Sequence, residues 1–248
     1  VLSKAADFDD RFRRLGLNLR VGFAVRVLNA AIQLALVALL LRVLGSERYG
    51  LFVTITSVAA WLQLGMLGAG KGLINAMVEA RSNDDHDLAR RSMWSLWSGL
   101  LLLVVVLGIG AALVLPAIHW SAVFPSQTVG EAELARTVGL AAAFALVALA
   151  LSPLGFVLSA HQEDAKGAGL LLARNAATLL AAGLMLEVGS RSMSGLTLAI
   201  GVGTTVVGAG AVVWLIGVDK PRLRPRAGDV SVALVVRALR ASGTFLAL

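Results

Sequence analysis

The sequence predicts an all-α integral membrane protein: a bundle of six transmembrane helices followed by the start of a seventh. Two features of its composition support this fold class. Hydrophobic residues make up 58% of the 248 positions and charged residues only 15%, whereas soluble domains are about one quarter charged. The mean hydropathy is +0.82, so too few polar residues remain to cover a surface that faces water.

Six apolar runs reach the roughly 20 residues that a helix needs to cross a hydrocarbon layer about 30 Å thick. They cover residues 21–44, 50–77, 93–118, 134–160, 168–189 and 194–218, and a seventh run begins near residue 232. The runs lack the strict alternation of strands and are dominated by Ala, Leu, Gly and Val. We therefore expect helices rather than the strands of a barrel.

The segments outside these runs complete the predicted domain organisation. Residues 1–20 form a charged, amphipathic cytoplasmic tail without the apolar core of a signal peptide. Residues 21–218 form the six-helix bundle, residues 219–231 a basic cytoplasmic linker, and residues 232–248 the start of helix 7. Because the chain lacks an initiator methionine and stops within an apolar run, we expect it to be part of a longer protein.

Local signals mark where helices end or bend. Gly45 is expected to end the first helix, and Ser46 to cap the second. Pro153 lacks a backbone donor and should bend the fourth helix. The third helix is preceded by acidic residues, which the positive end of the helix dipole favours: Asp84, Asp85 and Asp87.

The stretch GMLGAGKG, residues 65–72, comes within one residue of a phosphate-loop pattern. That pattern needs Ser or Thr where Gly72 stands, and it follows a strand, whereas an apolar crossing precedes this stretch. We therefore expect no nucleotide site. Two groups of glycines instead fit close helix packing or flexing: Gly65, Gly68, Gly70 and Gly72, and Gly201, Gly203, Gly208 and Gly210.

Basic residues set the predicted orientation, because loops rich in Lys and Arg stay in the cytoplasm. With the N-terminus inside, most of the 22 basic residues lie on the cytoplasmic side, and the outward ends carry only Arg42, Arg48, Arg136 and Arg191. The segment DKPRLRPRAGD, residues 219–229, could also be a nucleic-acid patch. No aromatic residue interleaves its arginines and membrane helices flank it, so we expect a cytoplasmic loop near anionic headgroups and no nucleic-acid partner.

Polar side chains within the predicted helices are the candidate binding residues. Such groups are costly in lipid and tend to face a cavity or one another. Arg26, Asn29 and Gln33 share one face of the first helix because they are three and four residues apart. No carboxylate is placed to neutralise the positively charged candidates. The candidates are Arg26, Asn29, Gln33, Lys71, Asn75 and Arg174.

The positive charges of such an interior would be neutralised by an anionic ligand or a lipid headgroup, or the side chains would extend to the membrane surface. The last alternative applies to Arg26, Lys71 and Arg174, since long basic side chains can reach headgroups from the cytoplasmic half of a helix. Arg26 fits this alternative least, because Asn29 and Gln33 continue its face deeper into the membrane.

Enzymatic chemistry is poorly supported by the sequence. His86, His119 and His161 lie in or beside loops of different segments, without the spacing of a metal site, and there is no cysteine. No grouping of Ser, His and an acid suggests a nucleophile. We expect a non-enzymatic protein with no metal and no cofactor.

Several motifs together resemble a known family. The pattern L-G-x-x-x-Y-G occurs at residues 44–50, a glycine-rich segment follows about fifteen residues later, and N-A-x-x-E-A occurs at residues 75–80. A turn that contains Gln162 follows the fourth helix. This order is similar to that of polysaccharide biosynthesis membrane proteins, the O-antigen-type flippases of the multidrug/oligosaccharidyl-lipid/polysaccharide exporter superfamily.

The resemblance implies the amino-terminal lobe of a two-lobed transporter in the bacterial cytoplasmic (inner) membrane. Such proteins move a polyprenyl-diphosphate-linked glycan between leaflets by alternating access, with a second lobe as partner, and residues 219–231 would link the lobes. Lys71 stands at a position that varies in the family, so the motif does not make it a ligand. Two alternatives stay open: a drug or cation exporter of the same superfamily, and a non-transporting membrane scaffold or truncated copy.

Overall fold

The structure of the protein, a computed structural model, describes the backbone of residues 2–64, 66–226 and 228–231. Side chains are described within these ranges except at residues 2–21 and 62–69. The predicted start of helix 7, residues 232–248, lies outside the described residues. Where the chain is described, every regular element is a helix, which confirms the all-α fold class.

The helices follow one another with short connections. In chain order they are α1 (Leu2–Leu44), α2 (Ser46–Leu64), α3 (Met66–Ser82), α4 (His86–Val114), η1 (Leu115–Ala117), α5 (Trp120–Val123), α6 (Glu131–Ala150), α7 (Pro153–Ala160), α8 (Asp164–Glu187), α9 (Met193–Trp214), η2 (Leu215–Asp219) and η3 (Pro221–Leu223). Among these, η2 is a π-helix, and η1 and η3 are 3-10 helices.

Five helical segments within the described residues are long and apolar enough to cross a membrane. They are Gly22–Leu44, His86–Ala117, Glu131–Ala160, Asp164–Glu187 and Met193–Asp219. Within the predicted helix over residues 50–77, the structure describes α2 up to Leu64 and α3 from Met66, and residue 65 between them lies outside the described residues.

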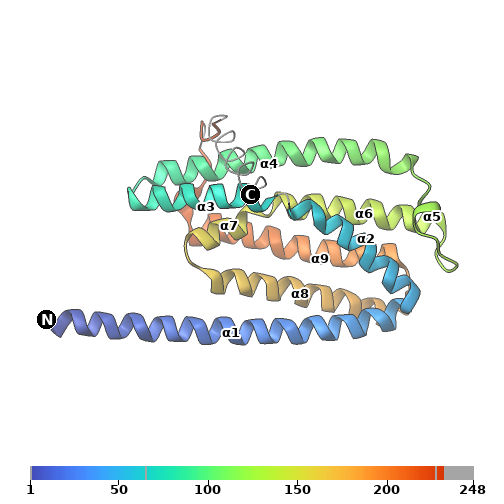
Figure 1. The fold of residues 1–248 in the computed structure, drawn as a ribbon, viewed down its shortest axis with the longest axis horizontal. Helices are drawn as coiled ribbons and strands as arrows, with labels where there is room; N and C mark the ends of the chain where they lie inside the picture. Colours follow the sequence, from blue (N-terminus) through green and yellow to red (C-terminus); the bar gives the residue numbers. More distant parts are fainter. Residues whose placement is uncertain (1, 65, 227, 232–248) are drawn as a thin grey trace.

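Figure 1 shows the order in which the helices pack across the bundle. α1 runs along α8, α8 packs on α9, and α9 packs on α6. At the opposite side, α4 packs on α3 and α6, while α3 also packs on α7. The N-terminal part of α1 continues as helix beyond the other elements, so residues 2–20 prolong the first helix in the structure.

The bundle has two ends and a buried cluster near each. The predicted cytoplasmic end comprises the turns at residues 83–85 and 161–163 and the segment 219–231, and its cluster includes Met93, Leu149, Val157 and Leu215. The predicted outer end comprises Gly45 and residues 115–130 and 188–192, and its cluster includes Leu134, Met193 and Leu196. Large apolar side chains cover the outside of α4, α8 and α9, as at Leu113, which is 74% exposed. This surface suits lipid rather than water.

The helix of residues 131–160 is interrupted as predicted at Pro153. α6 ends at Ala150 and α7 begins at Pro153. The carbonyl groups near the break still have partners, because Ser152 Oγ donates to Leu149 O at 2.7 Å and Trp97 Nε1 donates to Ala150 O at 2.8 Å. Side chains thus satisfy backbone groups that a continuous helix would pair, as a membrane interior requires.

The predicted helix ends are mostly confirmed. Gly45 has φ +79° and ends α1, a conformation that glycine adopts without strain. Asp85 caps α4 by accepting a hydrogen bond from Leu88 N at 2.9 Å. Ser46, however, is the first residue of α2 rather than its cap, because the first helical hydrogen bond runs from Tyr49 N to Gly45 O at 3.0 Å.

The segment 219–231 is docked against the bundle rather than extended away from it. The Arg90 guanidinium on α4 binds both carboxylate oxygens of Asp229 at 2.9–3.0 Å, and the two residues are only 5% and 3% exposed. Trp94 Nε1 also donates to Leu223 O at 2.8 Å. Because the partners lie more than a hundred residues apart, the sequence alone did not reveal this docking.

Candidate functional site

Arg174 is the candidate residue whose environment is most unusual. It lies near the middle of α8 and is half-buried, and its buried Nε makes no hydrogen bond within the described part of the chain. Gly208 on α9 leaves room for the guanidinium, since a Cβ there would lie 2.9 Å from Arg174 Nη2. The bundle therefore holds a half-buried cation near the middle of α8, and its Nε has no hydrogen bond among the described residues.

No carboxylate of the surrounding helices can pair with this cation near its depth. Residues 165–186 of α8 and residues 193–218, which form α9 and most of η2, contain neither Asp nor Glu, and the same is true of residues 22–44 of α1. An unpaired charge within a membrane helix is costly and usually marks a binding or transport site.

Asn29 joins α1 to the helix that carries Arg174. Asn175 Nδ2 donates to Asn29 Oδ1, so the middle of α8 and this part of α1 lie at the same level. Arg26 lies one turn from Asn29, about 4.5 Å along the axis, and is exposed on the bundle surface, as is Gln33. The structure thus brings four candidate residues to neighbouring positions on α1 and α8.

Lys71 and Asn75 lie elsewhere. Both are exposed on α3, which packs on α4 and α7 and is separated from α1 by other helices in Figure 1. The neighbouring Gly70 lies against the Phe156 ring of α7, with no room for a side chain. The six candidates therefore form two groups in this chain, and the prediction that they act together remains a prediction.

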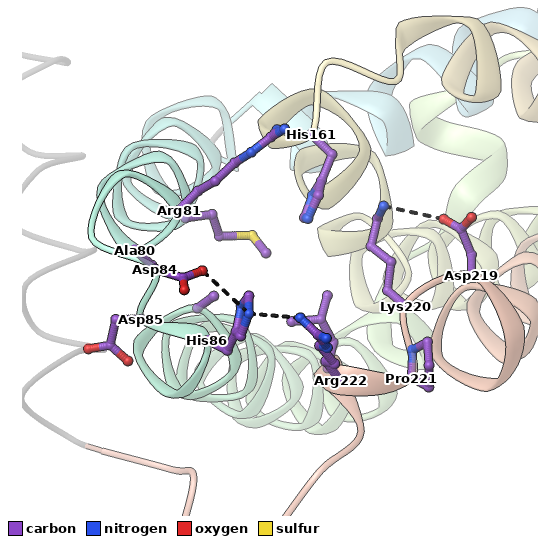
Figure 2. A pocket seen from close by; sticks show the side chains of 13 residues that line it. Ala80, Arg81, Asp84, Asp85, His86, His161, Asp219, Lys220, Pro221 and Arg222 are labelled. Carbon is purple, nitrogen blue, oxygen red and sulfur yellow. Dashed lines mark hydrogen bonds and ion pairs between the residues drawn. The ribbon is translucent and has the colours of Figure 1, made fainter.

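A pocket at the predicted cytoplasmic end involves none of the six. Figure 2 shows it between the end of α3, the start of α4, His161 after α7 and residues 219–223, with a volume of about 390 Å³. Arg222 Nη1 and His86 Nε2 lie 2.8 Å apart, and His86 Nε2 is 3.6 Å from Asp84. Three basic and three acidic side chains line the pocket, so its formal charge is balanced: Arg81, Lys220, Arg222, Asp84, Asp85 and Asp219.

His161 is the buried titratable group of this pocket. Its Nδ1 lies 2.8 Å from Val157 O, which identifies Nδ1 as the protonated nitrogen because a carbonyl can only accept. Burial lowers the pKa of His161, and the nearby positive charges of Lys220 and Arg81 lower it further. The ring is therefore neutral near pH 7, and the pocket gains no extra positive charge from it.

Comparison with known proteins was made for sequence and for structure. The sequence matches no family model, and no curated protein matches it. Among solved structures, a MOP superfamily transporter from Pyrococcus furiosus superposes on the chain with a TM-score of 0.63 and 20% sequence identity. The match covers 92% of this chain and 50% of that transporter. The chain has the fold of half a MOP superfamily transporter.

This fold supports the predicted all-α membrane architecture. Helices that could cross a membrane and a transporter neighbour together indicate a multi-pass membrane protein. The chain spans half the length of that transporter.

The sequence alone did not reveal the docking of residues 219–231 or the pocket at the predicted cytoplasmic end. Each is assembled from connections that lie far apart along the chain. The available signal was the gathering of charged residues and His86 and His161 at helix ends. A signal of this kind shows which residue types are present but not which of them meet.

Proposed function

We propose that the chain is one lobe of a transporter that moves a lipid-diphosphate-linked oligosaccharide across the bacterial cytoplasmic membrane by alternating access. The observation that carries this proposal is Arg174, a half-buried cation near the middle of α8 with a buried Nε that has no hydrogen-bond partner among the described residues. A site of this polarity suits an anionic substrate, and the half-transporter fold supplies the means of moving one.

A diphosphate matches the chemistry of the residues around Arg174. The planar guanidinium can donate two parallel hydrogen bonds to phosphate oxygens. Arg26 would add a second positive charge at nearly the same depth, while Asn29 and Gln33 offer amide hydrogen bonds. The apolar outer surface of the bundle would let the lipid tail stay in the membrane while the headgroup enters the site.

During alternating access, the second group of candidates, Lys71 and Asn75, would also contact the substrate. Lys71 and Asn75 are exposed on α3, across the bundle from α1, so a second lobe could close over both groups. The interruption at Pro153 provides a place where a helix can bend. In this mechanism the two groups contact the headgroup from different sides.

The charge of the residues within the helices distinguishes this proposal from export of drugs or cations. For the Pyrococcus furiosus transporter, the reverse polarity of the binding pocket suggests a different function. For the present chain, the absence of Asp and Glu from the middle of α1, α8 and α9 favours an anionic rather than a cationic substrate. A drug exporter would be expected to use a buried carboxylate in this lobe.

The test is transport by the full-length protein in proteoliposomes that contain a fluorescent lipid-diphosphate oligosaccharide. We expect Arg174→Gln to lower the initial rate about tenfold, because loss of one charge-assisted hydrogen bond costs roughly that factor. Arg26→Gln should lower the rate in the same direction. The matched control is Arg42→Gln, an exposed arginine in the last turn of α1 that lies away from the proposed site.

Two results would count against the proposal. One is an unchanged rate for Arg174→Gln and Arg26→Gln at equal protein levels. The other is efflux of cationic drugs, with no movement of the lipid-linked oligosaccharide, by the wild-type protein. Absence of any transport by a well-folded full-length protein would favour a scaffold instead.

A further inference from the structure

A second pocket lies at the predicted outer end of the bundle, and neither the comparisons nor the proposed function assigns it a role. Its volume is about 600 Å³. The start of α2, the start of α6 and the connection between α8 and α9 supply its walls. The lining residues are Arg48, Gly130, Ala132, Glu133, Arg136, Arg191, Ser192 and Ser194.

Arg48 and Glu133 hold these walls together. Arg48 Nη1 lies 3.4 Å from Glu133 and donates to Arg191 O at 2.8 Å, and Nη2 donates to Thr128 O at 2.7 Å. Glu133 Oε1 also accepts a hydrogen bond from Met193 N, the first residue of α9, at 2.7 Å. These contacts fix the loop that carries Arg191, and the two charges neutralise one another.

Two further arginines remain without partners in the described part of the chain. Arg136 and Arg191 are exposed, and neither side chain makes a hydrogen bond or ion pair with a described residue. Because Glu133 is the single acid among the lining residues and is paired with Arg48, the pocket has a formal excess of two positive charges.

Hydroxyl groups add donors beside these arginines, whereas the N–H groups of Met193 and Gly195 at the start of α9 already have acceptors. Ser192 Oγ accepts a hydrogen bond from Gly195 N at 3.1 Å and so caps α9, and it lies 3.1 Å from Ser194 Oγ. The positive end of the 22-residue helix α9 points toward the same place. Guanidinium groups, hydroxyl groups and a helix start are the groups that proteins use to bind phosphate.

We propose that this outer pocket binds a phosphate-class oxyanion between Arg136 and Arg191. The same chemistry would recognise the phosphate of a membrane lipid headgroup or a soluble phosphate or diphosphate. Because the pocket lies at the end of the spanning helices, we place it at the depth of the lipid headgroups. The side of the membrane that it faces is the one point that rests on the proposed function. The pocket is distinct from the Arg174 site, since the two share no residue.

The experiment uses the full-length protein in lipid nanodiscs and two probes. Radiolabelled pyrophosphate is titrated in nanodiscs of phosphatidylcholine alone, and retention of phosphatidylglycerol is measured by native mass spectrometry after reconstitution in an equal mixture of the two lipids. We expect Arg136→Gln and Arg191→Gln each to weaken binding of the recognised probe about tenfold. Arg42→Gln is the control, because it removes an exposed arginine at the same end that does not line the pocket.

The outcomes separate the two sources of phosphate. Pyrophosphate binding that depends on Arg136 and Arg191 supports a soluble anion, and selective retention of phosphatidylglycerol with the same dependence supports a lipid headgroup. An equal loss of probe binding in Arg42→Gln would overturn the proposal. So would a wild-type protein that neither binds pyrophosphate nor retains phosphatidylglycerol selectively. Since binding is measured without transport, a protein that binds a probe and moves no oligosaccharide contradicts the proposed function and leaves this site intact.

Discussion

Arg174 and Gly208 show how a single glycine can position a charge inside a membrane bundle. The guanidinium occupies space that any side chain at position 208 would fill, and the absence of a nearby carboxylate leaves its Nε unpaired. A residue that served stability alone would be better replaced by an apolar one. The retained charge is therefore most easily understood through a ligand.

Other glycines of α9 differ in how closely neighbouring helices approach them, and one pair offers a direct comparison. A Cβ at Gly201 would overlap the Phe144 ring of α6, whereas a Cβ at Gly210 on the same helix would meet nothing within 4 Å. Gly203 lies between these extremes, with Ala177 Cβ at 3.5 Å from the added atom. The sequence grouped all of these glycines together, and only the packing of α9 separates them.

We predict opposite effects for two substitutions in α9. Gly201→Ala should lower the free energy of unfolding by about 1–3 kcal/mol, because the added methyl group forces α6 and α9 apart. Gly210→Ala should leave it unchanged or raise it by up to about 1 kcal/mol, since alanine favours helix and has free space there. Thermal unfolding in detergent micelles measures both, and equal effects of the two substitutions would show that α6 and α9 do not pack this closely.

Among the elements, the segment 219–231 is the one whose observed conformation differs most from that expected from the sequence. Its composition, with two prolines and alternating arginines, suggests an extended linker. In the structure Asp229 is buried against Arg90, and Ser231 N donates to Ser95 Oγ at 2.9 Å. The segment is thereby held on α4.

The pKa of Asp229 gives this docking a pH dependence. Burial alone would raise the pKa of Asp229, but hydrogen bonds from Arg226 N and the Arg90 guanidinium outweigh it and lower the pKa. A lowered folded-state pKa means that the carboxylate stabilises docking above its unfolded pKa of about 3.9. The contribution is lost as the pH falls through the lower folded-state value, so docking is complete at neutral pH.

We predict that Asp229→Asn releases the segment at neutral pH. The amide cannot replace the charge-assisted bonds, so the backbone amides of Arg226 and Ser231 should exchange hydrogen faster, by about tenfold or more. Asp164→Asn, an exposed acid in the first turn of α8 at the same bundle end, is the control and should change neither amide. Unchanged protection in Asp229→Asn would show that the ion pair is not what holds the segment.

For the whole molecule, the two ends of the bundle are tied by different contacts. At the predicted cytoplasmic end, Lys166 binds Asp219 at 2.7 Å and Lys220 binds Glu163 at 2.9 Å, which joins α8 to the end of α9. At the predicted outer end, the Arg48 contacts join α2, α6 and the α8–α9 connection. Ties at both ends favour movement of this lobe as one body.

The orientation of that body in the membrane can be tested by labelling. The chain contains no cysteine, so Asn83→Cys and Gln127→Cys each introduce a single thiol at an exposed loop position. We predict that a membrane-impermeant maleimide labels Gln127→Cys in intact cells and labels Asn83→Cys only after permeabilisation, because basic residues favour the cytoplasm. The reverse pattern would show that the N-terminus lies outside.

The sequence by itself determined the properties that depend on composition and on neighbouring residues. These are the membrane class, the helical fold, the break at Pro153, the end of α1 at Gly45 and the presence of polar residues within the helices. Each follows from local chemistry, because apolar run length, the missing proline donor and glycine φ act within a few residues.

Which of these residues meet depends on the tertiary packing. The packing separates Lys71 and Asn75 from the group on α1 and α8, and it places Arg136 and Arg191 around one pocket. It also paired Arg90 with Asp229, 139 residues apart. Contacts of this kind depend on how helices pack across the bundle, and the pattern of a single segment carries no information about its distant partners.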